Sequence, residues 1–368
     1  MSTEAILVRK RVARLHESAG HTGTLLIVLV GVIVLFSALN PRVFATPLNL
    51  QSIGYAVPEI ALLALAIALT MSSAGIDLSV VAVANLSSLG GAAVAIAMLQ
   101  SGMSDPVAAL VGILVALVIG LVCGLINGAL IAYVRIAPIL ATLATMTLFT
   151  GIAIVLTRGE PLYGLPETTL ALGVQTIAIV PLSFWILCVV VALLFLLMNR
   201  TGFGLRVLLV GASAEAADYS GIRRSRVLMG TYATAGVIAA IAGVLMSARS
   251  ASATADYGAS YLLLAITIAV LGGTNPSGGR APIVGVAVAA LILQSISSGI
   301  TGMQISPYIY QIIQGLILVV VLVLESRRGR LGWLSRLMSR PVPDGAALTP
   351  PAEPATPSRR ERRGARTP

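Results

Sequence analysis

Apolar residues fill most of the chain in long runs, and the breaks between these runs divide it into ten segments. A run of about 20 apolar residues forms a helix that crosses the roughly 30 Å hydrocarbon core of a bilayer. The breaks predict spans at 22–39, 55–74, 79–99, 107–133, 138–157, 178–198, 227–248, 259–272, 282–299 and 307–325. The eighth is too short to cross alone, so we expect non-helical backbone at membrane depth near 272–281, enclosed by protein or by a water-filled cavity.

The composition excludes a soluble protein of this size. Hydrophobic residues make up 57% of the chain and charged residues only 10%, which is too little polar surface for a soluble chain of 368 residues. The predicted fold class is therefore an all-α polytopic membrane protein with about ten transmembrane helices, some of them broken or re-entrant.

The positions of Lys and Arg predict the orientation of these spans. With the N-terminus in the cytoplasm, 21 of the 24 Lys and Arg residues fall on the cytoplasmic side. Only Arg42, Arg158 and Arg249 fall on the extracytoplasmic side of the membrane. Cytoplasmic loops carry the excess of basic residues, so both termini are predicted to be cytoplasmic. The net charge of +10 then reports orientation in the membrane, and we expect no nucleic-acid partner.

The chain divides into three regions. Residues 1–21 form a cytoplasmic N-terminal segment, and 22–326 form the transmembrane domain with a long inner loop at 199–226. Residues 327–368 form a basic cytoplasmic tail, of which 341–368 is rich in Pro and Arg and is expected to be disordered. The arginines of the tail are either solvated or in contact with anionic membrane lipid.

No catalytic or metal-binding constellation is visible, so we expect neither catalytic residues nor a metal site. Both histidines precede the first span, and no G-x-x-x-x-G-K-[ST] phosphate-binding loop occurs. The two cysteines lie in apolar runs, as small buried hydrophobic residues do. An enzyme and a self-contained ATPase are therefore disfavoured. An ion-coupled carrier is disfavoured too, because no intramembrane acid–base relay stands out.

Two glycine-containing polar breaks are candidates for a solute path. They are "SAGIDLS" at 73–79 and "VLGGTNPSGGRAP" at 270–282, and broken helices in corresponding positions of two halves point to a transport path. Polar residues in and near the spans either bond helices together or suit a neutral, hydroxyl-rich solute. The candidates are Asp77, Ser79, Asn85, Asn127, Thr142, Thr145, Gly272, Gly273, Thr274 and Asn275.

Asp77 has two interpretations. An acid in lipid costs roughly 3 kcal/mol, so the carboxylate has to be sheltered. It either caps the helix that starts near 79, accepting an N–H bond from Ser79 or Val80, or contacts the solute.

The inner loop at 199–226 contains the signals of one short helix. Ser213 is a good N-cap, Glu215 suits the helix dipole in the first turn, and Gly221 supplies a stop. A helix of under two turns is unstable alone, so either a partner orders it or the segment is a solvated connector.

Several motifs together resemble one family. "AGIDLSV", "GLINGALIAYVRIAPILATLATM", "NRTGFGLRVLLVGASAEAADYSGI" and "AVLGGTNPSGGRAPIVG" resemble the permease subunits of bacterial ribose-type ATP-binding-cassette (ABC) importers, a group that includes branched-chain amino acid permeases. The resemblance covers about residues 50–325. It implies a multi-pass plasma-membrane permease for a monosaccharide or related polyol, in a homodimer or paired with a paralogue. ATP and Mg would be bound by separate ATPase subunits, with no cofactor in this chain, and solute would come from an extracytoplasmic binding protein.

The resemblance also assigns roles to parts of this chain. The segment 211–222 matches the family's ATPase-coupling segment, with candidate residues Gly211, Ser213, Glu215, Ala216, Ala217, Gly221, Ile222 and Arg223. Ala214, Ala216 and Ala217 would permit close approach of the ATPase. The outer Arg42, Arg158 and Arg249 either dock the binding protein or anchor the chain at the interface. A permease for branched-chain amino acids or nucleosides is the alternative, followed by an ion-coupled secondary transporter.

Overall fold

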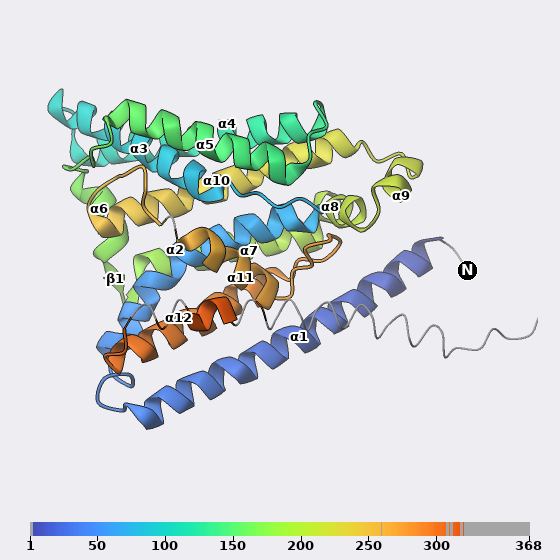
Figure 1. Cartoon of the computed structure of the whole chain (residues 1–368), viewed down its shortest axis with the longest axis horizontal. Coiled ribbons are helices and arrows are strands. Elements are labelled where there is room, and N and C mark those ends of the chain that lie inside the picture. The colour runs from blue at the N-terminus through green and yellow to red at the C-terminus, as the bar shows by residue number, and fades with distance from the viewer. Residues whose placement is uncertain (1–2, 259, 307–308, 310–311, 317–318, 320–368) are drawn as a thin grey trace, which may run out of the picture. The chain divides into compact units, whose positions relative to one another are not determined.

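In the computed structural model the described residues are 3–258, 260–306, 309, 312–316 and 319. They are almost entirely helical (Figure 1). The elements are α1 (Thr3–Leu39), α2 (Pro47–Ser72), α3 (Val80–Gln100), α4 (Asp105–Ala132), α5 (Pro138–Thr157), α6 (Glu167–Val174), β1 (Thr176–Ile177), β2 (Val180–Pro181), α7 (Leu182–Arg200), α8 (Gly202–Ala212), α9 (Ala214–Tyr219), α10 (Arg224–Ser250), α11 (Tyr261–Leu271) and α12 (Ile283–Gly302).

The predicted polytopic membrane fold is confirmed. Within the described residues, eight helices are long and apolar enough to cross a bilayer: Gly20–Leu39 of α1, and α2, α3, α4, α5, α7, α10 and α12. The predicted eighth span is the short helix α11. The predicted tenth span, 307–325, lies largely outside the described residues, and the tail 327–368 lies wholly outside them.

Two predicted boundaries were wrong, and the first span belongs to a longer helix. Helix α1 continues back through the predicted N-terminal segment to Thr3. Helix α2 starts at Pro47, eight residues early, because the Thr46 hydroxyl caps it by accepting the Asn49 N–H at 3.2 Å. Helix α7 starts only at Leu182, because the residues before it form the β1–β2 hairpin, with Ile177 opposite Val180.

The spans place short elements at two opposite ends of the helix bundle. We call the end with α8 and α9 the inner end and the end with α6 and β1 the outer end (Figure 1). Arg135, between α4 and α5, follows the inner end of α4. The arginines of the inner loop also lie at this end, as the orientation inferred from Lys and Arg requires.

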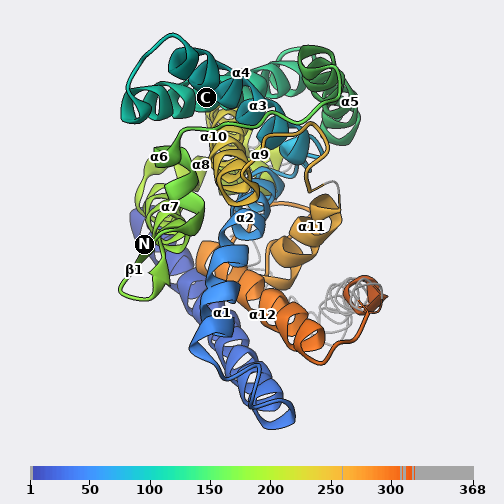
Figure 2. The same cartoon turned by 90° about the vertical axis from the view of Figure 1, so that its left-hand side faces the viewer.

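Helix α2 is the central helix of the bundle. Its hydrophobic part is almost wholly buried, and it contacts α10, α11, α12 and α7 (Figure 2). Exposed apolar side chains lie instead along α1, α4, α5 and α7, as on helices that face lipid. Polar side chains that project from α2 therefore point into protein.

Glycines bring α4 and α10 into backbone contact. A Cβ built on Gly120 would lie 2.4 Å from the Gly236 carbonyl oxygen, and one built on Gly236 would lie 2.1 Å from that of Gly120. Gly124 meets the backbone of Tyr232 in the same way. Small residues at such crossings let transmembrane helices pack at close range, and no larger residue fits at either position.

The non-helical backbone that enters the bundle is not the predicted one. Segment 272–282 lies at the inner end, where the Gly279 N–H donates to the Ser72 carbonyl at 3.0 Å. Two other segments leave helical geometry inside the bundle: 73–79 between α2 and α3, and 251–258, which follows α10 and is held by bonds from Asn85 on α3. The predicted eighth segment, 259–272, agrees with α11 (Tyr261–Leu271) to within two residues.

The orientation gives a labelling prediction. Cysteines placed at Ser220 and at Ser104 lie at opposite ends of the bundle, both exposed. Ser220→Cys should react with an impermeant thiol reagent only after the cytoplasmic side is opened, and Ser104→Cys in intact cells. Reaction of Ser220→Cys in intact cells would refute the orientation with α9 inside.

Candidate translocation path and coupling surface

Four residues from the first break, α4 and α5 join in one buried hydrogen-bond network. Asp77 Oδ1 accepts the Ser79 N–H at 2.8 Å and the Ser79 hydroxyl at 2.6 Å. Asn127 on α4 donates from Nδ2 to Ser79 Oγ at 2.7 Å, and Thr145 on α5 donates from Oγ1 to Asn127 Oδ1 at 2.6 Å. All four side chains are buried. The structure thus brings four of the predicted path residues together.

A fifth predicted residue, Thr142, fixes the backbone of the same break. Its hydroxyl accepts the Leu78 N–H at 3.1 Å and is 3.2 Å from the Ile76 carbonyl. Backbone groups outside a helix must find partners when they are surrounded by hydrocarbon or protein. Thr142 supplies two such partners, so it holds the non-helical segment in place.

Asp77 makes the predicted bond without being the helix cap. Its carboxylate accepts the Ser79 N–H, but the N-cap residue of α3 is Ser79 itself, two residues farther on. The prediction that Asp77 is the N-cap was therefore wrong, whereas the predicted shelter from lipid is confirmed. The network geometry favours a packing role for the carboxylate, and a direct contact with solute stays a prediction.

The depth of this network follows from helix geometry. Asn127 lies five residues before the end of α4 and Thr145 seven residues after the start of α5. At 1.5 Å per residue the network is about 8–10 Å from the inner ends of these helices. The broken segment 73–79 therefore reaches into the inner part of the membrane.

Asn85 belongs to a different contact, nearer the outer end. Its Nδ2 donates to the Ala255 carbonyl at 2.8 Å and to the Tyr257 carbonyl at 3.0 Å. Asn85 is six residues beyond Ser79 on α3, about 9 Å farther from the inner end. The 255–257 backbone is thus held near the middle of a roughly 30 Å hydrocarbon core.

The second predicted break packs against the first. Gly211 at the end of α8 is wedged between them, because a Cβ there would lie 2.0 Å from the Ser72 oxygen and 2.8 Å from the Gly279 nitrogen. Gly278, with φ +91°, comes within contact of Ala74 and the Gly211 carbonyl. The coupling segment and both breaks therefore share one backbone junction.

The other predicted residues of the second break lie apart from the Asp77 network. Among the described residues, neither Thr274 nor Asn275 forms a side-chain hydrogen bond to the Asp77 network. Gly272 and Gly273 have no side chain that could. The Asn275 side chain accepts the Ser277 N–H within its own turn, at 2.9 Å. The buried Thr274 hydroxyl has no hydrogen-bond partner among the described residues. These residues lie at the inner end, so a role in the backbone junction at Gly211 suits them better than a position in the middle of a solute path.

The predicted short helix of the inner loop is confirmed as α9. Ser213 caps it by accepting the Ala216 N–H at 3.2 Å, Glu215 is exposed in its first turn, and Gly221 follows with φ +74°. Ile222, half-buried, closes the turn by donating its N–H to the Ala217 carbonyl at 3.1 Å, and Arg223 beyond it is exposed.

One face of α9 is not available to a partner. Ala217 is buried in the hydrophobic core of this chain, so the prediction that it contacts the ATPase was wrong. Ala216 is exposed, and Tyr219 is 94% exposed. The sequence reading also missed α8, which contains Gly211. Thr201 caps α8, and the apolar residues that followed had been assigned to the loop.

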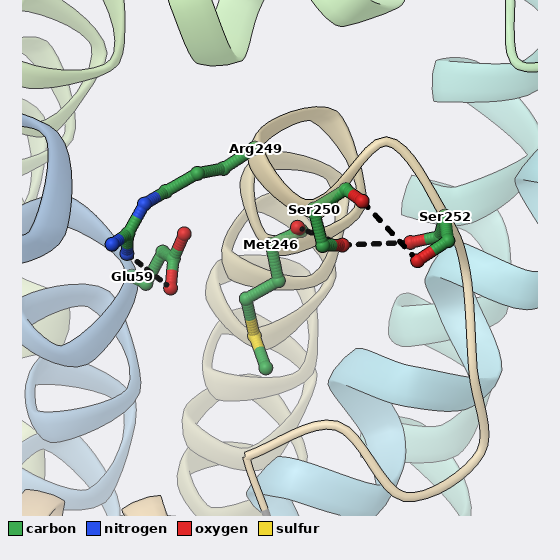
Figure 3. Close-up of polar contacts among 5 residues, drawn as sticks. All are labelled: Glu59, Met246, Arg249, Ser250 and Ser252. Atoms are coloured by element: carbon green, nitrogen blue, oxygen red, sulfur yellow. Dashed lines mark hydrogen bonds and ion pairs between the residues drawn. The ribbon is translucent and has the colours of Figure 1, made fainter.

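The three outer arginines differ in their surroundings. Arg42 and Arg158 are exposed, whereas Arg249 Nη1 pairs with Glu59 Oε2 on α2 at 3.3 Å (Figure 3). Arg249 is 38% exposed and Glu59 only 1%. Arg249 thus neutralises a buried carboxylate, which removes it from the free docking candidates. Glu59 was missed by the sequence reading, although a charged residue inside the predicted second span was the available signal.

Other sites are poor candidates for solute. No group of three or more His, Cys, Asp and Glu side chains in the described part of the chain could hold a metal ion. A cavity of about 490 Å³ between α7 and α12 is lined by apolar residues such as Phe184, Leu187 and Leu291. It has no polar group to orient a hydroxylated molecule.

These features define a class. Buried neutral polar contacts inside a bundle of membrane spans, together with a short helix displayed at one end, are typical of a transport subunit that receives energy through another protein. Residues 49–322 match the family described as branched-chain amino acid transport system / permease component, and the chain belongs to this family.

Individual relatives indicate the branch of the family to which the chain belongs. The chain is 36% identical over 301 residues to the ribose import permease protein of Bacillus subtilis (strain 168), covering 80% of this chain and 90% of the relative. It is 35% identical over 327 residues to the autoinducer 2 import system permease protein of Escherichia coli (strain K12), covering 84% and 94%. No solved structure matches the chain. The chain is an ABC import permease of this sugar-type branch, a transport subunit and not an enzyme, whose family implies ATPase and binding-protein partners.

Asp77 can be tested by substitution. Asp77→Asn retains an oxygen that accepts the two Ser79 bonds, so it should keep most transport. Asp77→Ala leaves a buried N–H and hydroxyl without their acceptor, at a cost of about 2 kcal/mol. The measurements are solute uptake and thermal stability of the purified protein in detergent. Loss of uptake by a stable, normally inserted Asp77→Asn protein would show that the charge itself is needed.

The ion pair gives a second test. Arg249→Gln leaves the buried Glu59 carboxylate unpaired and should destabilise the protein by about 2 kcal/mol, less than for a fully buried pair because Arg249 is partly exposed. Adding Glu59→Gln removes that charge and should restore most of the lost stability. Thermal unfolding of both single variants and the double variant measures the coupling. Equal, additive losses would mean that the two side chains do not act as a pair.

Proposed function

We propose that this chain is the inner-membrane permease of a bacterial ABC importer that carries a neutral, hydroxyl-rich monosaccharide of the ribose type. A binding protein outside the membrane would deliver the sugar, and ATPase subunits in the cytoplasm, holding ATP and Mg, would drive it. A second permease, identical or paralogous, would complete the path. The similarity to the ribose and autoinducer 2 import permeases supports the sugar branch over amino acids.

The chemistry of the spans is consistent with a neutral solute. At the first break an amide and two hydroxyls around one carboxylate exchange hydrogen bonds with each other, and the Thr142 hydroxyl binds the neighbouring backbone. The described ion pair within the bundle, Glu59–Arg249, has no net charge.

The junction at Gly211 is the observation that carries the energy-coupling part of the proposal. A partner that moves α9 would pull on α8, and α8 presses through Gly211 on Ser72 at the end of α2 and on Gly279. Movement of an ATPase could thus reach both broken segments by backbone contact alone. In this arrangement Ala216, Glu215 and Tyr219 form the exposed docking surface, with Arg223 at its edge.

Two of the outer arginines stay candidates for docking the binding protein, since the third, Arg249, is paired with Glu59. Arg42 and Arg158 are exposed at the outer end, in the loops after α1 and α5. Acidic residues of a binding protein would pair with them, and such pairing weakens with salt because exposed charges are screened.

A bulky residue on α9 should uncouple the importer. In membrane vesicles that contain the ATPase and binding protein, ribose uptake should require ATP and persist when ion gradients are collapsed. Ala216→Trp should lower this uptake at least tenfold, since Ala216 is exposed where a partner must approach closely. Gly211→Ala should keep the ATPase bound yet lower uptake, because its Cβ would overlap Ser72.

Ala137→Trp is the matched control, because Ala137 is an exposed alanine of the other inner loop, before α5. It should transport normally. Full uptake and ATPase binding by Ala216→Trp would reduce α9 to a connector. Uptake that stops with the ion gradient would favour a secondary carrier, and ATP-driven uptake of leucine in place of ribose would favour the amino acid branch.

A further inference from the structure

Segment 251–260 presents a polar face where the helix bundle should meet hydrocarbon. Asp256 and Ser260 are exposed, and Thr254 and Tyr257 are partly exposed. The bonds from Asn85 hold the carbonyls on either side of Asp256 near the middle of the membrane. Asp256 is therefore an exposed carboxylate on non-helical backbone at bilayer depth.

Lipid cannot cover such a segment. An exposed carboxylate near the bilayer centre costs several kcal/mol, and irregular backbone is tolerated there only where protein or water faces it. The helices that face lipid differ in composition, since α7 exposes Val189, Leu193 and Leu196 at comparable depth. The polar residues of this segment must therefore face protein, such as the second permease subunit, or a water-filled space.

The residues behind this face complete a polar wall. Glu59 and Arg249 lie close enough for their charges to act on the Tyr257 and Tyr261 phenols, whose rings meet edge to face at 6.2 Å. Glu59 has no hydrogen bond to either oxygen among the described residues, although Arg249 offsets its charge. A buried carboxylate with spare acceptor capacity is available to a mobile donor such as water or a hydroxyl group.

The outer attachment of the segment is also fixed. Ala251 adopts left-handed angles, φ 53°, at the end of α10. The Ser250 hydroxyl donates to the Met246 and Ser252 carbonyls at 2.8 and 2.9 Å, and the neighbouring Arg249 reaches across to α2 (Figure 3). Ala253 then pairs with Leu162 of the outer loop. The segment is thus anchored at its outer end and again at Asn85.

We propose that the polar face of 251–260 lines the outer half of the solute path, and that Asp256 and Tyr257 contact a neutral, hydroxylated solute as it enters. The carboxylate of Asp256 accepts hydroxyl groups, and the Tyr257 ring packs against the less polar C–H face of the solute. The solute class rests on the proposed function, whereas the position in a water-filled path rests on the segment alone.

Cysteine accessibility tests the lining, whatever the solute is. In a Cys188→Ser background, which retains only the buried Cys123, a charged, impermeant thiol reagent is added to cells with the assembled importer. Asp256→Cys and Ser260→Cys should react, as should Glu160→Cys on the exposed outer loop. Leu193→Cys, exposed on α7 at similar depth, should not react. Unreactive cysteines at both 256 and 260 would overturn the proposal.

Transport by charge variants tests the contact. Asp256→Asn should lower ribose uptake at saturating binding protein roughly tenfold, the factor expected for losing one charge-assisted hydrogen bond, and Asp256→Glu should retain most uptake. Stimulation of ATP hydrolysis by loaded binding protein should persist in both. Glu160→Gln is the control for an outer acid away from the segment. Normal ribose uptake by Asp256→Asn would overturn the contact.

The two proposals fail in different ways. If the wild-type importer takes up no ribose, the sugar assignment fails, and the uptake arm is repeated with autoinducer 2. The labelling of Asp256→Cys and Ser260→Cys does not depend on that result.

Discussion

Every backbone N–H and carbonyl inside a membrane needs a partner from the protein or from water, and this requirement organises the structure. Helices meet it within themselves, so among the described residues it becomes acute at 73–79 and 251–258, where the chain leaves helical geometry inside the bundle. Thr142 and Asp77 supply partners for the first segment, and Asn85 supplies them for the second. Three of the polar residues noticed in the sequence, Asp77, Asn85 and Thr142, thus bond backbone that lacks helical partners.

This arrangement separates two tasks that the sequence alone does not distinguish. At the inner end, glycines bring three segments into backbone contact around Gly211, which suits the transmission of movement. In the outer half, Asp256 and Tyr257 remain exposed, which suits contact with a solute. Between them, the Asp77 network is buried and satisfied, and its role is to hold the first break in shape.

The sequence predicts what depends on local pattern. Apolar length located the spans, and Ser213 and Gly221 located α9, because caps and stops act over a few residues. The bond from Asp77 to Ser79 spans two residues and was equally predictable. Asn127 and Ser79 are 48 residues apart, and no local pattern shows that α4 brings them together. The burial of Ala217 and the pairing of Arg249 with Glu59 likewise depend on how helices pack.

The glycine contact between α4 and α10 has a mechanical consequence. Because the two backbones touch at Gly120, Gly124 and Gly236, neither helix can roll or slide against the other without a steric clash. The pair therefore behaves as a single rigid body through any cycle of opening and closing. Any displacement in such a cycle then has to occur where this pair meets other helices and not at the contact between α4 and α10.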